Sequence, residues 1–552
     1  MSDMEPAGQA EPNEPEARKN WAKASAVMAA GTVVSRVLGF LKAMLLTATI
    51  GVTMSGAADA FALANKLPNN IYAIIIGGLL NAVLVPQIVR AGLHKDGGQR
   101  FINRLLTLFI TVFGAMTVLA TLASPFLVLL YAGSSASLTG DTIALATSFA
   151  YWCMPQIFFY ALYTVLGEVL NARNYFGPYM WTPVLNNLIG IAGLVAFLVI
   201  FGPMGPEHAS VTDWTASQIT LLGGSATIGV AAQAILLFFF WKKVGLGLKL
   251  DFHWRGTGFR RVGKAYSWTF GSLLVMQGAG LISTQIAFYA SGAGASVAAL
   301  DTAWLVVMLP HSIAVVSITT TFFTRISEDA AKENWDRLKE NLTLVTRVVG
   351  LLSVISSLYL IVVALPFGVL FTGGFEQGIQ FGEVIMGYAA GLIFYSFVYV
   401  LQRTFFALED TKTPFMYNLI YVAWYLIGVF ACLLLPLERI AIGIAVVTSV
   451  GMLIQSVAAS LMLRRKIRIL DFKPVVISYL RYIALGAVSA VLGLATFLLF
   501  GGSGPGSYPM SGRLEALLVC AVVGVVMLGS YLVLLKLSKS SDLRLILASI
   551  RR

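Results

Sequence analysis

Residues that carry enzyme chemistry are scarce in this chain. Its 552 residues include only four His and three Cys. Neither a Gly-x-x-x-x-Gly-Lys-Ser/Thr phosphate loop nor a His-Glu-x-x-His zinc helix occurs. No pair of carboxylates lies within an apolar run, as a general acid and base would, since Glu409 and Asp410 are followed by Lys412 in a predicted turn. We therefore expect no catalytic residue, no metal site and no cofactor. These absences favour a protein that moves a molecule over one that makes or breaks a bond.

Charged residues are also scarce. They make up 12% of the chain, whereas 58% of the residues are hydrophobic, and an average soluble domain is about 25% charged. Apolar runs of about 18 residues or more recur along the chain and are continuous rather than alternating, which predicts membrane helices and not a β-barrel. Cys153, Cys432 and Cys520 fall within such runs, so we expect buried thiols rather than disulfides.

The net charge of +12 does not indicate nucleic-acid binding. The basic residues gather in loops on one side of the predicted membrane, as the positive-inside rule requires. The chain is thus predicted to be an all-α polytopic membrane protein with about 14 transmembrane helices and with both termini in the cytoplasm.

The hydrophobic pattern divides the chain into seven parts. We expect a disordered cytoplasmic tail, a first lobe of six helices, a basic cytoplasmic linker, a second lobe of six helices, a cytoplasmic loop, two added helices and a basic tail. These parts cover residues 1–22, 23–242, 243–264, 265–463, 464–474, 475–537 and 538–552. The linker interleaves basic and aromatic residues, which is typical of a solvated positive-inside loop or of a segment lying on anionic lipid headgroups.

A repeat supports the two lobes. Asp59 precedes Pro68 by nine residues, and Asp301 precedes Pro310 by nine residues, so the two copies are 242 residues apart. Six helices per copy would give both lobes the same orientation, and parallel repeats of this kind form transporters whose substrate site lies between the halves. Chance recurrence of Leu-Pro in a Leu-rich chain is the alternative. Pro68, Pro155 and Pro310 are predicted kink or hinge points, because proline removes a helical hydrogen bond.

Four charges lie where membrane helices should be apolar. Arg36 and Lys42 fall within the first apolar run, and Asp59 and Lys66 fall within the second. An ionisable group in the bilayer core costs at least roughly 2.5–3.5 kcal/mol and usually faces a bundle interior or a water-filled cavity. The pattern predicts a positively charged cavity. Snorkelling of Arg36 or Lys42 to an interface and solvation of Asp59 at the loop are the alternative interpretations.

Four strings in the chain resemble the MurJ/MviN family, and together they span a resemblance from about residue 23 to 537. The strings are SRVLGF at 35–40, DAF to KLPN at 59–69, LNA to PVLNN at 170–187, and ALEDTKTP at 407–414. The resemblance implies the fold of the multidrug/oligosaccharidyl-lipid/polysaccharide exporter superfamily. It also implies a lipid II flippase of the bacterial cytoplasmic membrane that works by alternating access in peptidoglycan synthesis, with two added helices forming a groove for the lipid tail.

The resemblance also implies site residues. Arg36 and Lys42 match two functional basic positions of the first helix, the second of which is commonly Arg. Asp59, Lys66, Pro68 and Asn69 match the motif of the second helix. We expect Arg36, Lys42 and Lys66 to bind the pyrophosphate of lipid II, because Arg and Lys make charge-assisted bonds to phosphate oxygens. Asp59 is expected to orient a nearby cation, and Asn69 to contact the head group.

Two positions depart from the family pattern. Tyr72 stands where an Arg often follows the Leu-Pro-Asn, and Trp304 and Leu305 stand where helix 8 often carries an Arg. Arg173 and Arg403 are the candidates to supply the missing charge.

Lipid II, anionic membrane lipids and cell-wall synthesis proteins are the expected partners. Export of another polyprenyl-linked glycan or of drugs, and a non-transporting role as a cell-wall scaffold, are the alternative functions. Na⁺, H⁺ and the membrane potential are all retained as energy sources, because the sequence shows no ion-site motif.

Overall fold

The computed structural model describes residues 14–91, 96, 98–133, 140–173, 175–208, 210–253, 263–467, 471–540 and 542–544. Within these ranges, the side chains of residues 14–29, 75–91 and 263–266 lie outside the description. Most of the predicted tail (residues 1–13), part of the basic linker (254–262) and the end of the basic tail (545–552) also lie outside it.

Helices are the regular elements of the described chain, with one isolated β-bridge between Thr53 and Ala295. The α-helices are α1 (Glu14–Ile50), α2 (Gly56–Ala91), α3 (Gln99–Leu122), α4 (Ser124–Ala132), α5 (Gly140–Cys153), α6 (Gln156–Ala172), α7 (Phe176–Phe201), α8 (Ala216–Phe238), α9 (Gly263–Ala287), α10 (Val297–Pro310), α11 (Val316–Ala331), α12 (Trp335–Val362), α13 (Ala364–Thr372), α14 (Phe375–Ala389), α15 (Leu392–Ala407), α16 (Lys412–Ala431), α17 (Ile440–Lys466), α18 (Lys473–Leu499) and α19 (Arg513–Leu537). Short 3₁₀ turns and one π-helical turn, η5 (His311–Val315), join some of them.

Thirteen segments of the described chain are long and apolar enough to cross a membrane. With α2, which is 36 residues long, they match the fourteen expected helices one by one. Several expected helices are interrupted. The third is divided at Ala123 into α3 and α4, the fourth at Pro155 into α5 and α6, and the tenth at Gly391 into α14 and α15. The eighth comprises α10, η5 and α11. The first begins at Glu14, so residues 14–22, which we expected in the tail, are helical.

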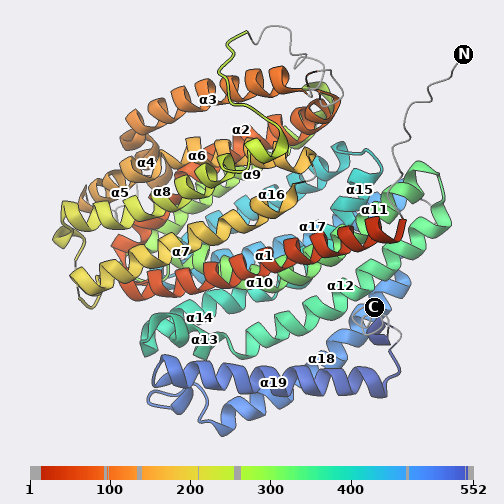
Figure 1. Ribbon diagram of the computed structural model, residues 1–552. Helices are drawn as coiled ribbons and strands as arrows, with labels where there is room; N and C mark the ends of the chain where they lie inside the picture. Colours follow the sequence, from red (N-terminus) through yellow and green to blue (C-terminus); the bar gives the residue numbers. More distant parts are fainter. Residues whose placement is uncertain are drawn as a thin grey trace, which may run out of the picture.

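The two lobes repeat the same helix pairings. In the first lobe α1 contacts α7, α7 contacts α8, α6 contacts α8, and α3 contacts α6. The corresponding helices of the second lobe, six membrane helices later in the chain, make the same pairs. These pairs are α9 with α16, α16 with α17, α15 with α17, and α12 with α15. The repeat noticed at Asp59 and Asp301 is therefore a repeat of the structure, and Figure 1 shows the long helices of both lobes running side by side.

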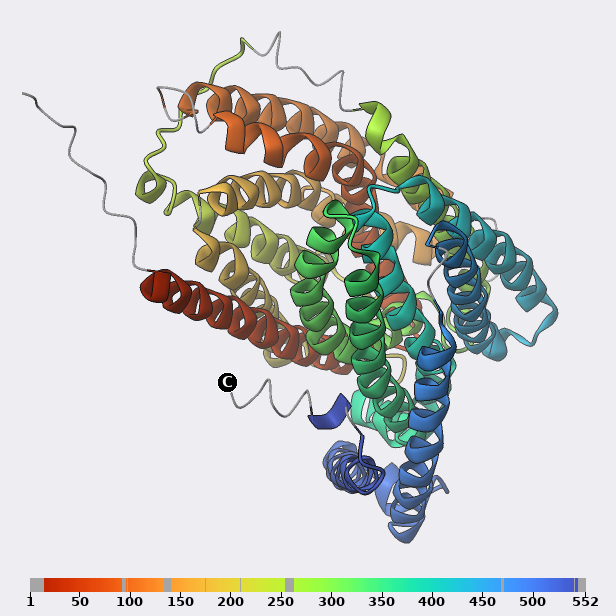
Figure 2. The ribbon, with the colours of Figure 1, turned by 90° about the vertical axis from the view of Figure 1, so that its right-hand side faces the viewer.

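The last two long helices lie outside this repeat. α18 packs against α12, and α19 packs against α13 and α18, so both cover one edge of the bundle (Figures 1 and 2). The segment that follows α19 is fastened back onto them. Buried Asp542 pairs with Arg347 of α12 at 2.8 Å and accepts a hydrogen bond from Tyr482 of α18.

Candidate functional site

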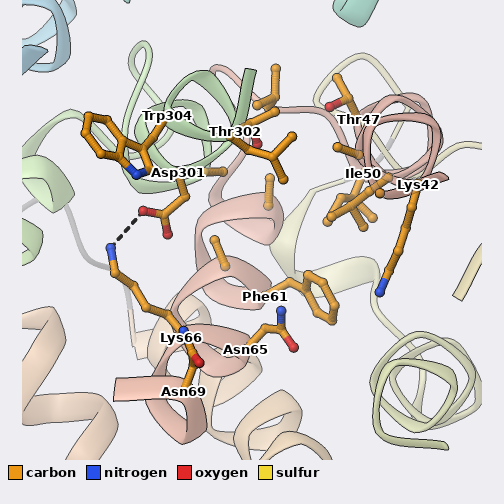
Figure 3. Close-up of a pocket in the computed structure, with 18 of the residues that line it drawn as sticks. Lys42, Thr47, Ile50, Phe61, Asn65, Lys66, Asn69, Asp301, Thr302 and Trp304 are labelled. Carbon is orange, nitrogen blue, oxygen red and sulfur yellow. Dashed lines mark hydrogen bonds and ion pairs between the residues drawn. The ribbon is translucent and has the colours of Figure 1, made fainter. Parts of the chain in front are cut away.

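A cavity of about 530 Å³ lies between α1 and α2 of the first lobe and α10 of the second. Its lining includes three of the expected site residues, Lys42, Lys66 and Asn69. Figure 3 shows Lys42 on one side of this cavity and Lys66 on the other, with Phe61 and Asn65 between them. The remaining polar lining comes mainly from Thr47, Asn70, Asn187, Asp301 and Thr302.

Lys42 reaches the cavity from the middle of α1 along the surface of α7. A Cβ atom at Gly190 would lie 2.6 Å from Lys42 Cε, so glycine at this position makes room for the lysine stem. The Lys42 side chain is half-buried. Within the described residues, its ammonium has no hydrogen bond and no carboxylate within 4 Å.

Lys66 is paired across the two lobes. Its Nζ lies 2.8 Å from Oδ1 of Asp301 on α10, and both side chains are partly exposed, at 28% and 41%. The dashed line in Figure 3 marks this ion pair. Asn69 lies almost one turn beyond Lys66 on α2 and is exposed. The cavity thus holds one paired and one unpaired lysine, together with amides that both donate and accept hydrogen bonds.

Asp59 has a different role from the one we expected. Its carboxylate is buried and accepts hydrogen bonds from the Ala298 backbone N–H at 2.9 Å and from the Ser291 hydroxyl at 2.6 Å. No cation lies within ion-pair distance of it in the described part of the chain. Asp59 therefore caps the N-terminus of α10, where the free backbone N–H groups and the helix dipole favour a carboxylate. The expected cation is replaced by a helix end.

Further contacts join the lobes beside Asp59. Met54 N–H donates to Gly294 O at 2.8 Å, and Thr53 forms the antiparallel bridge with Ala295. Together with the two bonds of Asp59, these contacts join the two lobes at the predicted outer end of the protein. We call this set of contacts, from residues 53, 54, 59, 291, 294, 295 and 298, the outer seal.

Arg36 lies apart from the two lysines. Its side chain is exposed and does not line the cavity, but it lies within electrostatic range of buried His311 in η5. His311 packs edge-on against Tyr399 with ring centroids 5.1 Å apart. Arg403 donates to the Tyr399 hydroxyl at 3.0 Å and lies over its ring. The two arginines therefore flank one aromatic group that includes His311.

The other expected positions lie outside the cavity. Arg173 follows α6, where its backbone N–H caps the helix end. Tyr72 carries no charge, and its hydroxyl is hydrogen-bonded to the Thr164 hydroxyl. Of the three prolines, Pro155 separates α5 from α6, Pro310 ends α10 at the π-helical turn, and Pro68 lies within an uninterrupted α2.

Sequence reasoning missed the part that Asp301 plays in this cavity. It identified Asp301 only as the repeat counterpart of Asp59, and the missing basic residue of helix 8 drew attention to Trp304 instead. Asp301 is an acidic residue within a predicted membrane helix, and no Lys or Arg lies near it in the sequence. A charge in such a place predicts a partner from another helix, and that signal could have found it.

A second hollow of about 370 Å³ lies between α12 and α19. Its lining is mostly apolar and includes Ile355, Val525, Met527 and Leu528. Tyr359 and Ser356, the polar lining residues, donate their hydroxyls to backbone carbonyls of Cys520 and Leu352. The hollow therefore offers few free polar groups and suits a hydrocarbon chain.

Comparison with known proteins decides the family. A family model described as "Lipid II flippase MurJ" matches residues 46–511, which is most of the chain. The chain belongs to the MurJ family. Its members are transporters rather than enzymes, and this member is a multi-pass membrane protein.

Relatives and solved structures agree with this assignment. "Probable lipid II flippase MurJ" of Buchnera aphidicola subsp. Acyrthosiphon pisum is 24% identical over 394 residues, which are 69% of this chain and 72% of the relative. The Haemophilus influenzae protein of the same description is 24% identical over 407 residues, covering 69% and 75%.

Two solved structures share the fold. A structure described as "Lipid II flippase MurJ, inward closed conformation" has a TM-score of 0.67 at 19% identity, covering 90% of this chain and 98% of that one. An inward-facing multidrug resistance MATE family transporter of the MOP superfamily has a TM-score of 0.62 at 14% identity, covering 78% and 94%.

Proposed function

We propose that this protein moves lipid II from the inner to the outer leaflet of the bacterial cytoplasmic membrane by alternating access between its two lobes. Family membership supports the substrate, and the basic loops support cytoplasmic termini. Lipid II carries an anionic pyrophosphate, a sugar-peptide head and a long prenyl tail, so its carrier needs a cationic, hydrated chamber beside an apolar surface.

The observation that carries the proposal is the pair of lysines in the cavity between the lobes. Lys42 has no anionic partner there, and Lys66 is held by one carboxylate of the opposite lobe. Ammonium groups bind phosphate oxygens through charge-assisted hydrogen bonds, which are about twice as strong as neutral ones. We assign both lysines to the pyrophosphate and Asn69 to the head group. Arg36, which lies outside the cavity lining, is assigned to the path by which the anion arrives.

The ion pair between Lys66 and Asp301 would couple binding of the pyrophosphate to movement of the lobes. In the absence of substrate Asp301 neutralises Lys66 and links α2 to α10 across the lobes. A pyrophosphate that binds Lys66 competes with Asp301, so binding of the anion weakens a contact between the lobes. A ligand shifts a conformational equilibrium only through its different affinity for the two states. Competition for Lys66 supplies such a difference.

The outer seal supports alternating access in the same way. Asp59 and its neighbours join the lobes at the predicted outer end, where substrate would leave. Release to the outer leaflet requires these hydrogen bonds to break and the two lobes to separate there. The hollow between α12 and α19 is proposed to hold the prenyl tail during this step, as its apolar lining suits hydrocarbon.

Complementation tests the proposal. Cells depleted of their native lipid II flippase should grow when they express the wild-type protein or Lys42→Arg, but not Lys42→Ala, at equal membrane levels. Lys332→Ala is the matched control, because Lys332 is an exposed lysine at the end of α11 and lies outside the cavity lining. Arg36→Ala should also impair growth. Full growth with Lys42→Ala and Lys66→Ala combined would indicate a non-transporting scaffold.

Mass spectrometry of the co-purified lipid separates the remaining alternatives. The proposal expects lipid II to be retained by the wild-type protein and reduced in the Lys42→Ala protein. Retention of a different polyprenyl-linked glycan, lost in the same variant, would reassign the substrate while keeping the site.

A further inference from the structure

Part of the basic linker between the lobes is fastened to α3. After the turn η2 (Lys242–Val244), residues 245–253 run without helical structure along the first two turns of that helix. We call residues 245–253 the linker strap. Three helix side chains bond its backbone: Gln99 donates to Gly247 O at 3.5 Å, Asn103 accepts from Lys249 N–H at 3.4 Å, and Thr107 accepts from Asp251 N–H at 2.8 Å.

An ion pair completes the attachment. Arg104 Nε lies 2.9 Å from Oδ2 of Asp251, and the other carboxylate oxygen accepts from the backbone N–H of His253 at 3.0 Å. These hydrogen bonds and the cation together lower the pKa of Asp251 to about 2. The carboxylate is therefore charged at every physiological pH.

The contacts with α3 also indicate how deep in the membrane the strap is expected to lie. Gln99 is the first residue of α3, and Thr107 lies eight residues further along, which is about 12 Å along a helix axis. α3 is one of the candidate membrane spans, and the strap follows it from its end toward its middle. A bilayer has a hydrocarbon core of about 30 Å within a total of about 40–45 Å. A segment bound along about the first 12 Å of a membrane helix is therefore expected among the headgroups and at the edge of the hydrocarbon.

The side chains of the strap alternate in character. Leu248, Leu250 and Phe252 are 51%, 59% and 59% exposed, whereas the backbone N–H groups of Lys249 and Asp251 bond α3. Alternate residues of an extended segment point to opposite faces. The hydrogen-bonding edge of the strap is thus bound to the helix, and three large apolar side chains of the strap remain exposed.

The charges around this apolar face are mainly positive. Among the described residues on or beside the strap, the exposed cations are Lys242, Lys243, Lys249 and Arg100, and the exposed acid is Asp96. Asp251 pairs with Arg104 and is hydrogen-bonded to the His253 ring. Apolar side chains flanked by cations at an interface match an anionic leaflet, whose headgroup phosphates attract Lys and Arg.

We propose that the linker strap is a membrane anchor: Leu248, Leu250 and Phe252 insert into the leaflet at the N-terminal end of α3, and the surrounding cations bind anionic headgroups. The anchor fixes the linker to the first lobe and to one leaflet. The proposal concerns the lipid environment of the strap and does not depend on which lipid the cavity transports.

Site-directed fluorescence tests this proposal without any transport assay. The three native cysteines are buried, so a single added cysteine can be labelled selectively with an environment-sensitive dye. Leu250→Cys and Lys249→Cys are compared in the full-length protein, in nanodiscs of phosphatidylcholine with and without phosphatidylglycerol. Size-exclusion chromatography of each labelled protein confirms folding, and Val446→Cys, on an exposed face of α17, is the positive control for lipid contact.

The anchor predicts opposite quenching at neighbouring positions. The dye at position 250 should be quenched by lipids that carry a spin label near the headgroup and not by iodide in the water, while the dye at position 249 should be quenched by iodide. Phosphatidylglycerol should increase the lipid quenching at position 250, and changing Lys242, Lys243 and Lys249 together to Gln should abolish that increase. Iodide quenching at position 250 in both lipid mixtures would overturn the proposal and leave a soluble partner as the occupant of the face.

Discussion

Asp301→Asn removes the charge that holds Lys66 and keeps the size and hydrogen-bonding capacity of the side chain. The proposed competition then predicts an unusual combination of effects. Lys66 would no longer be neutralised by the protein, so pyrophosphate should bind more tightly. The contact that substrate binding is meant to weaken would already be weak, so binding should no longer favour movement of the lobes. Affinity should rise while transport falls.

The size of the affinity change follows from the geometry of the pair. Lys66 Nζ and Asp301 Oδ1 are 2.8 Å apart, but the side chains are 28% and 41% exposed. Solvent screening therefore limits the pair to about 1 kcal/mol, the upper part of the range for exposed ion pairs. That energy corresponds to an about fivefold gain in affinity. Lys66→Ala should act in the opposite direction by about 1.5–3 kcal/mol, because a hydrogen bond to a charged group is lost.

The assay is titration of the purified protein in nanodiscs with lipid II, read by native mass spectrometry, for the wild type, both single variants and the double variant. Lys66→Ala alone leaves Asp301 unpaired, where it repels the pyrophosphate, so adding Asp301→Asn to Lys66→Ala should restore part of the lost affinity. The two residues are in contact, so their effects should not add. Weaker binding by Asp301→Asn than by the wild type would refute the competition between Asp301 and the substrate, although not the binding of lipid II itself.

Four other predictions concern single groups. Lys42→Ala should weaken lipid II binding about tenfold or more, at about 1.5–3 kcal/mol, whereas Lys42→Arg should keep most of it; equal binding by both would contradict the role of the cation. Asp59→Ala should weaken the outer seal, lowering the free energy needed to separate the lobes there by about 1–3 kcal/mol. The measurement is increased labelling of cysteines placed on the cavity side of the seal; unchanged labelling would disprove the seal. Asp542→Ala removes the carboxylate that pairs with partly buried Arg347 and should destabilise the protein by about 2 kcal/mol, below the range for fully buried pairs, in thermal unfolding; an unchanged Tm would show that the pair is dispensable. Because the pKa of Asp251 is lowered to about 2, attachment of the linker strap should be complete above the ordinary Asp pKa of about 3.9 and be lost only as the pH falls toward 2; loss of amide protection at pH 5 in hydrogen exchange would contradict this.

Much of the fold could be predicted from the sequence, because membrane helices are encoded by long continuous apolar runs. The repeat at Asp59 and Asp301 predicted two like-oriented lobes, and the helix pairings confirm it. The interruptions were harder to predict. Pro155 signals one of them, but the divisions at Ala123 and Gly391 depend on tertiary packing, and neither residue prevents a helix from continuing.

The basic residues of the cavity could be predicted from the sequence, but the roles of the two aspartates could not. Lys42 and Lys66 stand out because a charge in an apolar run needs a polar environment. The roles of Asp59 and Asp301 depend on which residues the other lobe presents, and spacing along one chain segment does not contain that information. Asp59 meets a helix N-terminus and Asp301 meets Lys66, so two aspartates at equivalent places in the repeat have different partners.

Binding of lipid II to the protein with both cavity lysines replaced tests the central claim most directly. Wild-type protein and Lys42→Ala/Lys66→Ala protein would be incubated with lipid II in matched nanodiscs and compared by native mass spectrometry, with Lys332→Ala, at an exposed lysine outside the cavity, as the control for lost positive charge. The account predicts a lipid II adduct on the wild-type and control proteins and its near-complete loss from the double variant. An adduct of equal abundance on all three proteins would contradict it.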